Sequence, residues 1–502
     1  MVLCILHNQY NTDEMDCTSS AMAATTFSLP LHQEQQRSQQ PHWPNRMATV
    51  MCAKITARVE EMLKGSRLKR STNQHIALIR PEIDFVNVDD KVLGSGSFSQ
   101  VTAVTTRDGR RYALKHLKRS LMDRQDEFQL AAAELACEAH ILSSLDHPNI
   151  LKIKGWAENG IASFETGQHN SFFLMLDLLD ETLNQRIERW RDEQEHHDFT
   201  SMTTPIMTQQ QPSFWRRVMR CPNAYQTALV QKQLEQHTDQ LYHQTLYLDK
   251  LRIMKEIASA IAYIHSNGII FRDLKPNNIG FIGNKVQIFD FGLSRELPAL
   301  DTSIPFAMSG KVGTLRYMAP EVARHQHYNV SADVYSFAMV SYELLSLEKP
   351  FDGWTRDMHA DLVCNRGVRP DTIHTMHPIP AEMTLVLQQA WSNNPTCRGT
   401  MSQICAQIQY LESQQTKYLA EQQLQVDFQQ HLQQQQRNHM AMALPTQAAA
   451  HIPIHFSEDM SYGTPSACHF KACFPRSSCV SLDDSMGTID TGSLSAESDY
   501  HF

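Results

Sequence analysis

The sequence predicts an α+β fold with two lobes, a β-rich lobe followed by a helical one, and disordered tails at both ends. Between residues 83 and 178, short β-branched segments are interrupted by one stretch with helical apolar spacing, residues 127–145. From Leu248 to about Leu411 most apolar residues recur at helical spacing. The two ends are rich in Gln and Ser and show no period, which is typical of disorder.

The elements of the first lobe follow one another closely. Residues 101–105 alternate like a strand, Asp108-Gly109 is a hairpin turn signal, and residues 111–117 suit the returning strand. The helix predicted over 127–145 ends before His147-Pro148, because the residue before proline avoids helix. Residues 172–179 form an apolar run that predicts a buried strand.

The helical lobe begins with an amphipathic stretch, residues 248–266, and continues with apolar helices at 330–347 and 383–391. We expect a disordered region at 1–82, one ordered domain at 83–412 and a Gln-rich disordered tail at 413–502. Within the domain, residues 184–246 lose the pattern, so we interpret them as an insertion, mostly a loop with one helix near 226–244. The tail can begin as a helix.

Composition excludes several classes of protein. The 502 residues are 42% hydrophobic and 20% charged, which permits a sizeable core. A formal net charge of −9 argues against general nucleic-acid binding, and no apolar run approaches membrane-spanning length. The 11 cysteines are scattered without a Cys-x-x-Cys pair, which indicates a reducing compartment. We expect a cytoplasmic or nuclear protein. The basic cluster Lys64–Arg70 is either a nuclear import signal or a solvated linker.

One stretch carries the clearest chemistry, Phe271–Asn278 with the sequence Phe-Arg-Asp-Leu-Lys-Pro-Asn-Asn. Asp273 can accept a hydroxyl proton, Lys275 can meet phosphate charge, and Asn278 can hold a metal ion. Asp290-Phe291-Gly292 follows 12 residues after Asn278 and supplies a second acidic group. This combination suits phosphoryl transfer, whereas a short Arg-Asp pair alone is usually solvated surface.

A second group of motifs lies in the β-rich lobe. Gly94-Ser95-Gly96-Ser97-Phe98-Ser99-Gln100-Val101 follows a strand, and its glycines would let backbone amides approach phosphates. Alone it is weak evidence, because a Gly/Ser turn between strands is common. Lys115 lies 21 residues after Gly94 on a predicted strand and could reach the same phosphates. Glu138, or Glu134 one turn earlier on the following helix, could pair with Lys115.

These motifs, together with Ala319-Pro320-Glu321, occur in the order and spacing of eukaryotic-type protein kinases, and residues of about 86–412 resemble that family. The resemblance implies a bilobal kinase fold, with lobes at about 86–178 and 179–412, that binds ATP and Mg²⁺. Asp273 and Lys275 would be catalytic, while Asn278 and Asp290 would hold Mg²⁺. The residues that would surround the nucleotide are Leu93, Gly94, Ser95, Gly96, Val101, Ala113, Lys115, Glu138, Asp177 and Leu178, with Leu176 beside the adenine.

The resemblance also indicates the substrate. Lys275, two residues after Asp273, resembles serine/threonine kinases, and so does Gly313–Glu321. Arg366–Pro370, and Trp391 with Arg398, resemble the tyrosine-kinase-like branch. The implied function is transfer of the ATP γ-phosphate to Ser or Thr of protein substrates in intracellular signalling, without nucleic-acid partners. The alternative is a catalytically silent scaffold.

Two positions depart from the family pattern, and several others are expected to support the fold. Phe271 stands where the family has His, and Ser99 stands where it has the third loop glycine; both motivate the silent alternative. The resemblance implies structural roles for Asp333, which would hold the catalytic loop, and for an ion pair between Glu321 and Arg398. Arg272 would hold a phosphorylated activation loop, with Thr302, Ser303 and Ser309 as candidate acceptors.

Overall fold

A computed structural model describes residues 43–203, 222–299, 301–308, 313–375 and 377–442. The chain divides into two compact units, Met1–Leu432 and Gln433–Phe502. The fold below belongs to the first unit. Of the second, the structure describes only the end of one long helix.

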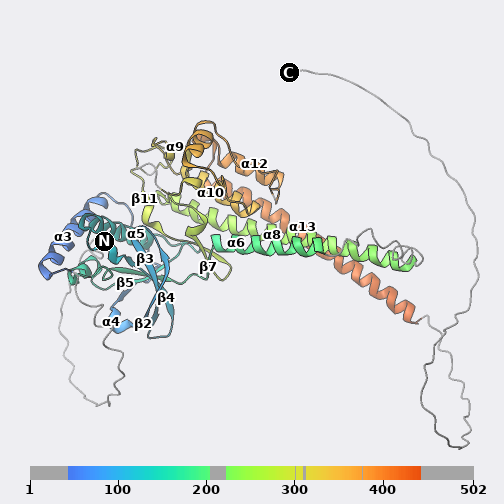
Figure 1. Ribbon diagram of the computed structural model, residues 1–502, viewed down its shortest axis with the longest axis horizontal. Helices are drawn as coiled ribbons and strands as arrows, with labels where there is room; N and C mark the ends of the chain where they lie inside the picture. The colour runs from blue at the N-terminus through green and yellow to red at the C-terminus, as the bar shows by residue number, and fades with distance from the viewer. Residues whose placement is uncertain (1–42, 204–221, 300, 309–312, 376, 443–502) are drawn as a thin grey trace, which may run out of the picture. The chain divides into compact units, whose positions relative to one another are not determined.

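The first lobe is a six-stranded sheet in the order β1-β5-β6-β4-β3-β2, visible in blue and cyan in Figure 1. Neighbouring strands are antiparallel, except that β1 runs parallel to β5. Gly109 adopts a φ of +78° in the turn between β3 and β4, as the Asp-Gly signal predicts. The elements are β1 (Ala77–Ile79), α4 (Pro81–Asp84), β2 (Phe85–Ser95), β3 (Ser99–Thr106), β4 (Arg111–Leu117), α5 (Gln125–Ser144), β5 (Ile153–Ala157) and β6 (Phe173–Asp177).

The second lobe is mainly helical, as predicted. Two small sheets, β10-β9-β7 and β11-β8, lie at its junction with the first lobe. The helices are α6 (Leu183–Thr203), α8 (Pro222–Ser266), α9 (Pro320–Ala323), α10 (Ser331–Ser346), α11 (Arg356–Met358), α12 (Ala381–Ala390) and α13 (Met401–Met442). The strands are β7 (Glu181–Thr182), β8 (Ile269–Ile270), β9 (Ile279–Ile282), β10 (Lys285–Ile288) and β11 (Arg295–Glu296).

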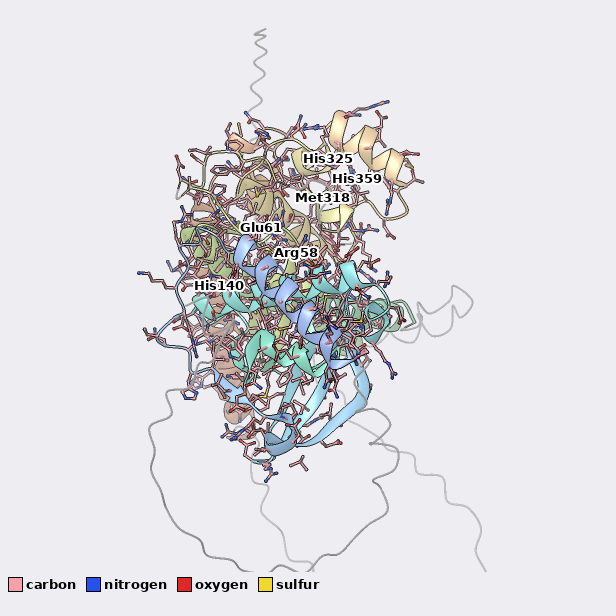
Figure 2. All side chains as sticks on the ribbon, turned by 90° about the vertical axis from the view of Figure 1, so that its left-hand side faces the viewer. Arg58, Glu61, His140, Met318, His325 and His359 are labelled. Carbon is pink, nitrogen blue, oxygen red and sulfur yellow. The ribbon has the colours of Figure 1, made fainter. Side chains whose placement is uncertain are left out.

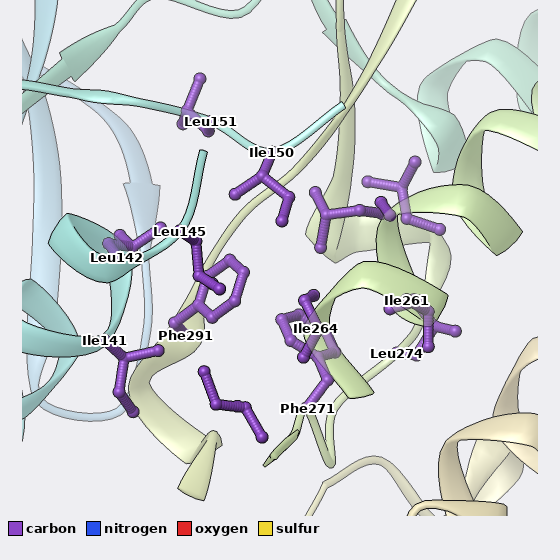
Figure 3. Packing of buried hydrophobic residues seen from close by; sticks show 14 of the residues in the cluster. Ile141, Leu142, Leu145, Ile150, Leu151, Ile261, Ile264, Phe271, Leu274 and Phe291 are labelled. Carbon is purple, nitrogen blue, oxygen red and sulfur yellow. The ribbon is translucent and has the colours of Figure 1, made fainter. Parts of the chain in front are cut away.

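A continuous hydrophobic core joins the two lobes. Figure 3 shows side chains of α5, among them Leu142, facing Ile264 of α8 across Phe271 and Phe291. All four side chains are buried. Burying apolar area removes it from water at roughly 25 cal/mol per Å², so this layer holds the catalytic segments against both lobes.

The N-terminal prediction of disorder is wrong for the described part. Residues 45–62 form α3, and β1 extends the sheet. The overlooked signal is helical spacing of Ala48, Met51, Ile55 and Val59, which all are buried. The polar residues between them hid this face, because it is narrow and covers only one side of the helix.

The predicted loop at 184–246 is also largely helical where it is described. Helix α6 runs to Thr203, and α8 starts at Pro222 instead of Leu248. Helix α13 continues past the predicted boundary at residue 412, and Figure 1 shows it alongside α8. Gln415 donates from Nε2 to Gln244 O at 3.0 Å and to its Oε1 at 2.8 Å. Gln favours helix but is polar, so Gln-rich helices form without a clear hydrophobic periodicity.

None of the described helices combines the length and the apolarity that crossing a membrane requires.

Candidate active site

Lys115 connects three elements at the junction of the lobes. It lies on β4 opposite Leu174 of β6, and its Nζ lies 2.7 Å from both Glu138 oxygens on α5. The same Nζ lies 2.7 Å from Asp290 Oδ1 in the segment after β10. The predicted pair of Lys115 with Glu138 is therefore confirmed. Glu134, the alternative, lies 3.8 Å from Arg295 instead.

Charge holds this group together in spite of burial. Burial alone would lower the pKa of Lys115, but the carboxylates of Glu138 and Asp290 outweigh it and raise that pKa. The Lys115 ammonium in turn lowers the pKa of Asp290 below its ordinary value. The Lys115 side chain is 9% exposed, whereas that of Asp290 is 42% exposed. One end of the cluster is dry and the other faces solvent.

Asp290 has an unusual backbone. Its φ is +65°, in the left-handed region that residues other than glycine rarely adopt. Such a conformation costs of order 1–3 kcal/mol and persists only where the surroundings impose it. Here the bond of Asp290 to Lys115 and the burial of the next side chain, Phe291, hold the turn in this conformation.

The catalytic loop brings three predicted residues together between β8 and β9. Lys275 Nζ lies 2.6 Å from Asp273 Oδ2. Asn278 donates from Nδ2 to the same Oδ2 at 2.9 Å and to Asp273 O at 2.9 Å. Asp273 Oδ1 is buried and has no hydrogen-bond partner within the described chain. A buried acceptor of this kind is costly unless another group uses it, so a substrate hydroxyl is its natural partner.

The backbone of that loop is fixed by Asp333 of α10. The Phe271 N–H donates to Asp333 Oδ2 and the Arg272 N–H to Oδ1, each at 2.8 Å. The resemblance implied this bracing role, and the structure confirms it. His265 at the end of α8 adds a contact of 2.9 Å from Nε2 to Asp333 Oδ2. Sequence reasoning missed His265, because only the fold places α8 beside α10.

Phe271 replaces the family His without leaving a hole. Its ring packs edge-to-face on Phe291 with 5.0 Å between centroids, and both rings are buried. Other groups tie the segment instead: Arg272 donates from Nε to Leu293 O at 2.6 Å, and Ser294 donates from Oγ to Phe271 O at 3.3 Å. The substitution therefore keeps the packing and moves the hydrogen bonding to neighbours.

The glycine-rich segment forms the hairpin between β2 and β3. Gly96 N–H donates to Ser99 O at 2.9 Å, so Ser99 closes the turn at the place of the third glycine. Gly94 pairs with Val101 and Ser95 with Gln100 across this hairpin. Leu93 lies on the same strand and is exposed. The predicted residues thus line one loop, and no substitution in it blocks the turn.

The predicted adenine-binding residues lie on adjoining strands. Ala113 of β4 is opposite Leu176 of β6, and both side chains are buried. Asp177 ends β6 and pairs with Lys154 at 3.0 Å, while the half-buried Leu178 follows. Val101 of β3 is opposite Lys115 of β4. These strand positions place the residues on neighbouring parts of one sheet.

The donor set fits a magnesium ion held with a nucleotide. Asn278 uses Nδ2 on Asp273, so its amide oxygen is the atom left for a cation, and Asp290 has one oxygen beyond its bond to Lys115. In the part of the chain that the structure describes, no cluster of three His, Cys, Asp or Glu could hold a metal by itself. Mg²⁺ commonly takes one or two protein oxygens and completes its shell with phosphates and water.

The remaining predicted positions have mixed outcomes. Arg398 donates from Nη1 and Nη2 to the two Glu321 oxygens at 2.6 and 2.8 Å, which confirms the structural ion pair. Ser303 donates to Asp301 Oδ1 at 2.6 Å on an exposed turn. Ser309 lies outside the described residues, so the choice between these acceptors stays open.

Comparison with known proteins decides the family. The sequence profile described as "Protein tyrosine and serine/threonine kinase" matches residues 88–408, which is more than half of the chain. The chain belongs to this kinase family. It is 34% identical over 164 residues to the Serine/threonine-protein kinase STY46 of Arabidopsis thaliana, covering 32% of this chain and 27% of that protein.

Two further relatives from Arabidopsis thaliana are similar. The Serine/threonine/tyrosine-protein kinase HT1 is 36% identical over 160 residues, which is 32% of this chain and 39% of that protein. The Serine/threonine-protein kinase VIK is 42% identical over 129 residues, which is 23% of this chain and 30% of that protein. The aligned part of the kinase domain thus spans well under half of each relative.

Proposed function

We propose that this kinase transfers the γ-phosphate of ATP to Ser or Thr residues of proteins. The observation that supports it best is the pairing of Lys115 with both Glu138 and Asp290, at 2.7 Å each. This arrangement joins the two lobes through one buried ammonium. A scaffold without catalysis has no need for a strained Asp290 whose carboxylate faces solvent.

The side chains divide the chemistry between them. Lys115 would hold the α- and β-phosphates, and Asn278 and Asp290 would hold Mg²⁺, which neutralises phosphate charge when bound. Asp273 would orient the substrate hydroxyl and take its proton at Oδ1, which has no partner among the described residues. Lys275, 2.6 Å from Asp273 Oδ2, would offset charge on the transferred phosphoryl group. Catalysis would then be mostly positioning and charge stabilisation.

Serine/threonine specificity rests on Lys275 and on relatives named as serine/threonine kinases. HT1 is named for tyrosine as well, so the test must separate the acceptors. The full chain would be incubated with Mg²⁺, ATP labelled at the γ-phosphate and a mixture of Ser-, Thr- and Tyr-containing peptides. We expect label on phosphoserine and phosphothreonine after hydrolysis. Label on phosphotyrosine alone would contradict the proposal.

The Asp273→Asn variant separates an enzyme from a scaffold. Asparagine has the size of aspartate, and its amide oxygen can still accept weaker hydrogen bonds from Lys275 and Asn278. It cannot accept the proton of a substrate hydroxyl. We expect transfer to fall by roughly 10²–10⁴. Equal label from both proteins would contradict the catalytic role of Asp273, and no label from the wild type at any Mg²⁺ concentration would support the silent scaffold instead.

We also propose a cytoplasmic or nuclear location. Cys52, Cys137 and Cys364 are buried free thiols, which suits a reducing compartment. Fluorescence microscopy of the tagged chain would test it, and secretion into the medium would contradict it.

A further inference from the structure

The segment from Trp43 to Ile79 is not used by the proposed chemistry, yet it is built into the catalytic lobe. We propose that this segment is an internal brace that holds α5 and β11 in the arrangement needed for phosphoryl transfer, with Arg67 and Glu296 as positioning residues. This inference rests on the proposed function. It is argued from three contacts of the segment: with the start of α5, with β11, and with the end of α5 beside β5.

The first contact is α3 on α5. Trp43 donates from Nε1 to Met122 O at 3.3 Å, and its ring packs edge-to-face on Phe128 of α5 at 4.8 Å. Gln129 of α5 donates to Lys54 O at 3.2 Å. Figure 2 looks onto α3, with Arg58 and Glu61 labelled towards its C-terminal end and His140 of α5 to the side. Helix α5 is buried along most of its length, so it needs cover on more than one side, and α3 supplies part of it.

The second contact is a clasp on the strand that follows the Asp290 turn. Glu296 Oε1 accepts from Arg67 N at 2.9 Å and from Arg67 Nε at 3.2 Å, and Oε2 accepts from Ser66 Oγ at 2.6 Å. Arg67 also donates from Nη2 to Leu297 O at 2.6 Å. The Glu296 carboxylate is 17% exposed. One exposed ion pair is worth little, but a carboxylate with three donors fixes a geometry.

The same clasp reaches α5. Ser66 Oγ lies 3.1 Å from His140 Nε2, and His140 is two residues from Glu138 on α5. Glu296 is six residues from Asp290 and lies on β11, which pairs with β8 just before Phe271. Ser66 therefore touches both the helix that carries Glu138 and the strand that follows Asp290.

The third contact is the added strand. Ser71 N–H donates to Ser143 O at 2.8 Å, and Gln74 donates from Nε2 to Leu142 O at 3.2 Å, at the end of α5. Strand β1 then pairs with β5, where Ala77 is opposite Gly155. A Cβ at Gly155 would lie 2.6 Å from Ile79 Cγ1, so this strand approaches only because residue 155 is glycine.

These contacts bear on the active site through geometry. The bond from Lys115 to Glu138 forms only if α5 lies against β4, and the bond to Asp290 depends on the turn that ends in β11. The brace fixes both partners to one segment. Losing the clasp removes one of the links between α5 and β11, beside the 3.8 Å contact of Glu134 with Arg295, and the population with both bonds falls.

The experiment is a charge exchange in the full chain. Arg67→Glu and Glu296→Arg are each expected to lower kcat/KM for phosphate transfer by about tenfold, through two repelling charges and a lost clasp. The double variant restores an ion pair and is expected to recover at least half of the loss on a logarithmic scale. The control is Arg80→Glu, because Arg80 lies outside the clasp. Its exposed side chain pairs with Glu158, with 3.7 Å between Arg80 Nε and Glu158 Oε1. Arg80→Glu should change transfer less than twofold.

A second readout does not need activity. Hydrogen exchange of the α5 amides should speed up in each single charge variant, slow again in the double variant, and stay unchanged in Arg80→Glu. If the wild type transfers no phosphate, the proposed function fails while this exchange pattern still reports on the brace. Single variants that match Arg80→Glu in exchange, or a double variant that recovers neither exchange nor activity, would overturn the inference.

Discussion

Two buried ion pairs of the same chemical type sit in this kinase, and they differ in what surrounds them. Arg398 is fully buried, and its guanidinium makes four hydrogen bonds, to both Glu321 oxygens, Ser331 O and Ser392 O. Lys115 is nearly as dry, but its partner Asp290 is 42% exposed, and Asp273 Oδ1 has no hydrogen-bond partner among the described residues. A saturated pair can only hold the fold together, whereas an unsaturated one has room for a ligand. The contrast predicts that stability and activity separate between the two sites.

The largest expected effect is on stability at the saturated pair. Arg398→Met leaves the Glu321 carboxylate buried without its partner, so the free energy of unfolding should fall by about 3–5 kcal/mol. Urea unfolding followed by circular dichroism measures it. Arg366→Met is the control, because Arg366 and Asp361 form an exposed pair, and it should cost less than about 1 kcal/mol. Equal losses in both variants would remove the contrast.

Activity should be lost at the unsaturated pair. Lys115→Met removes the ammonium that meets Glu138 and Asp290, and phosphate transfer should fall by roughly 10²–10³, as for loss of one preorganised charge. The unfolding energy should fall less than in Arg398→Met, because Asp290 is solvated and Glu138 can take up a proton. If Lys115→Met lowers the unfolding energy as much as Arg398→Met does, the main role of Lys115 is to stabilise the fold.

Phe271 offers an intermediate test of the segment between the two sites. Phe271→His should retain the edge contact with Phe291 but bury a polar ring, which should cost about 1–2 kcal/mol of unfolding energy and change transfer less than about threefold. Steady-state kinetics beside urea unfolding would measure both. A large gain in transfer would mean that Phe271 restrains the Asp290 turn rather than supporting it.

The smallest effect is a pH dependence. Lys115 lowers the pKa of Asp290 below its ordinary value of 3.8, so the stability from this charge is present above that value and is lost as pH falls through the lower, folded-state pKa. The unfolding energy of wild type minus that of Asp290→Asn should therefore stay constant between about pH 5 and 7. It should shrink only below the ordinary value. Shrinkage already near pH 6 would contradict the assigned charge.

The sequence predicted the residues of the site better than the helices that surround it. Lys115, Asp273, Asn278 and Asp290 lie in short motifs whose order and spacing resemble those of the kinase family, and the structure places them at the junction of the lobes. The residues alone left Glu138 and Glu134 open and the resemblance favoured Glu138; the contact with Lys115 of β4 decides between them.

The elements that the sequence did not predict are mainly polar helices. Helices α3, α8 and α13 pack through single narrow faces or through glutamine side chains, so hydrophobic periodicity is weak where they begin. The clasp of Arg67 on Glu296 joins residues 229 apart in sequence. A basic cluster that could be a linker or an import signal gave no hint of this contact, because its partner is set by tertiary structure alone.

The most direct test of the central claim is the rate of γ-phosphate transfer by wild type and by Asp273→Asn, measured side by side with their unfolding energies. The site predicts a loss of at least roughly 10² in rate with little change in stability, since Asp273 serves the substrate hydroxyl and not the core. Equal rates in the two proteins would contradict the assignment of this cluster as a catalytic centre.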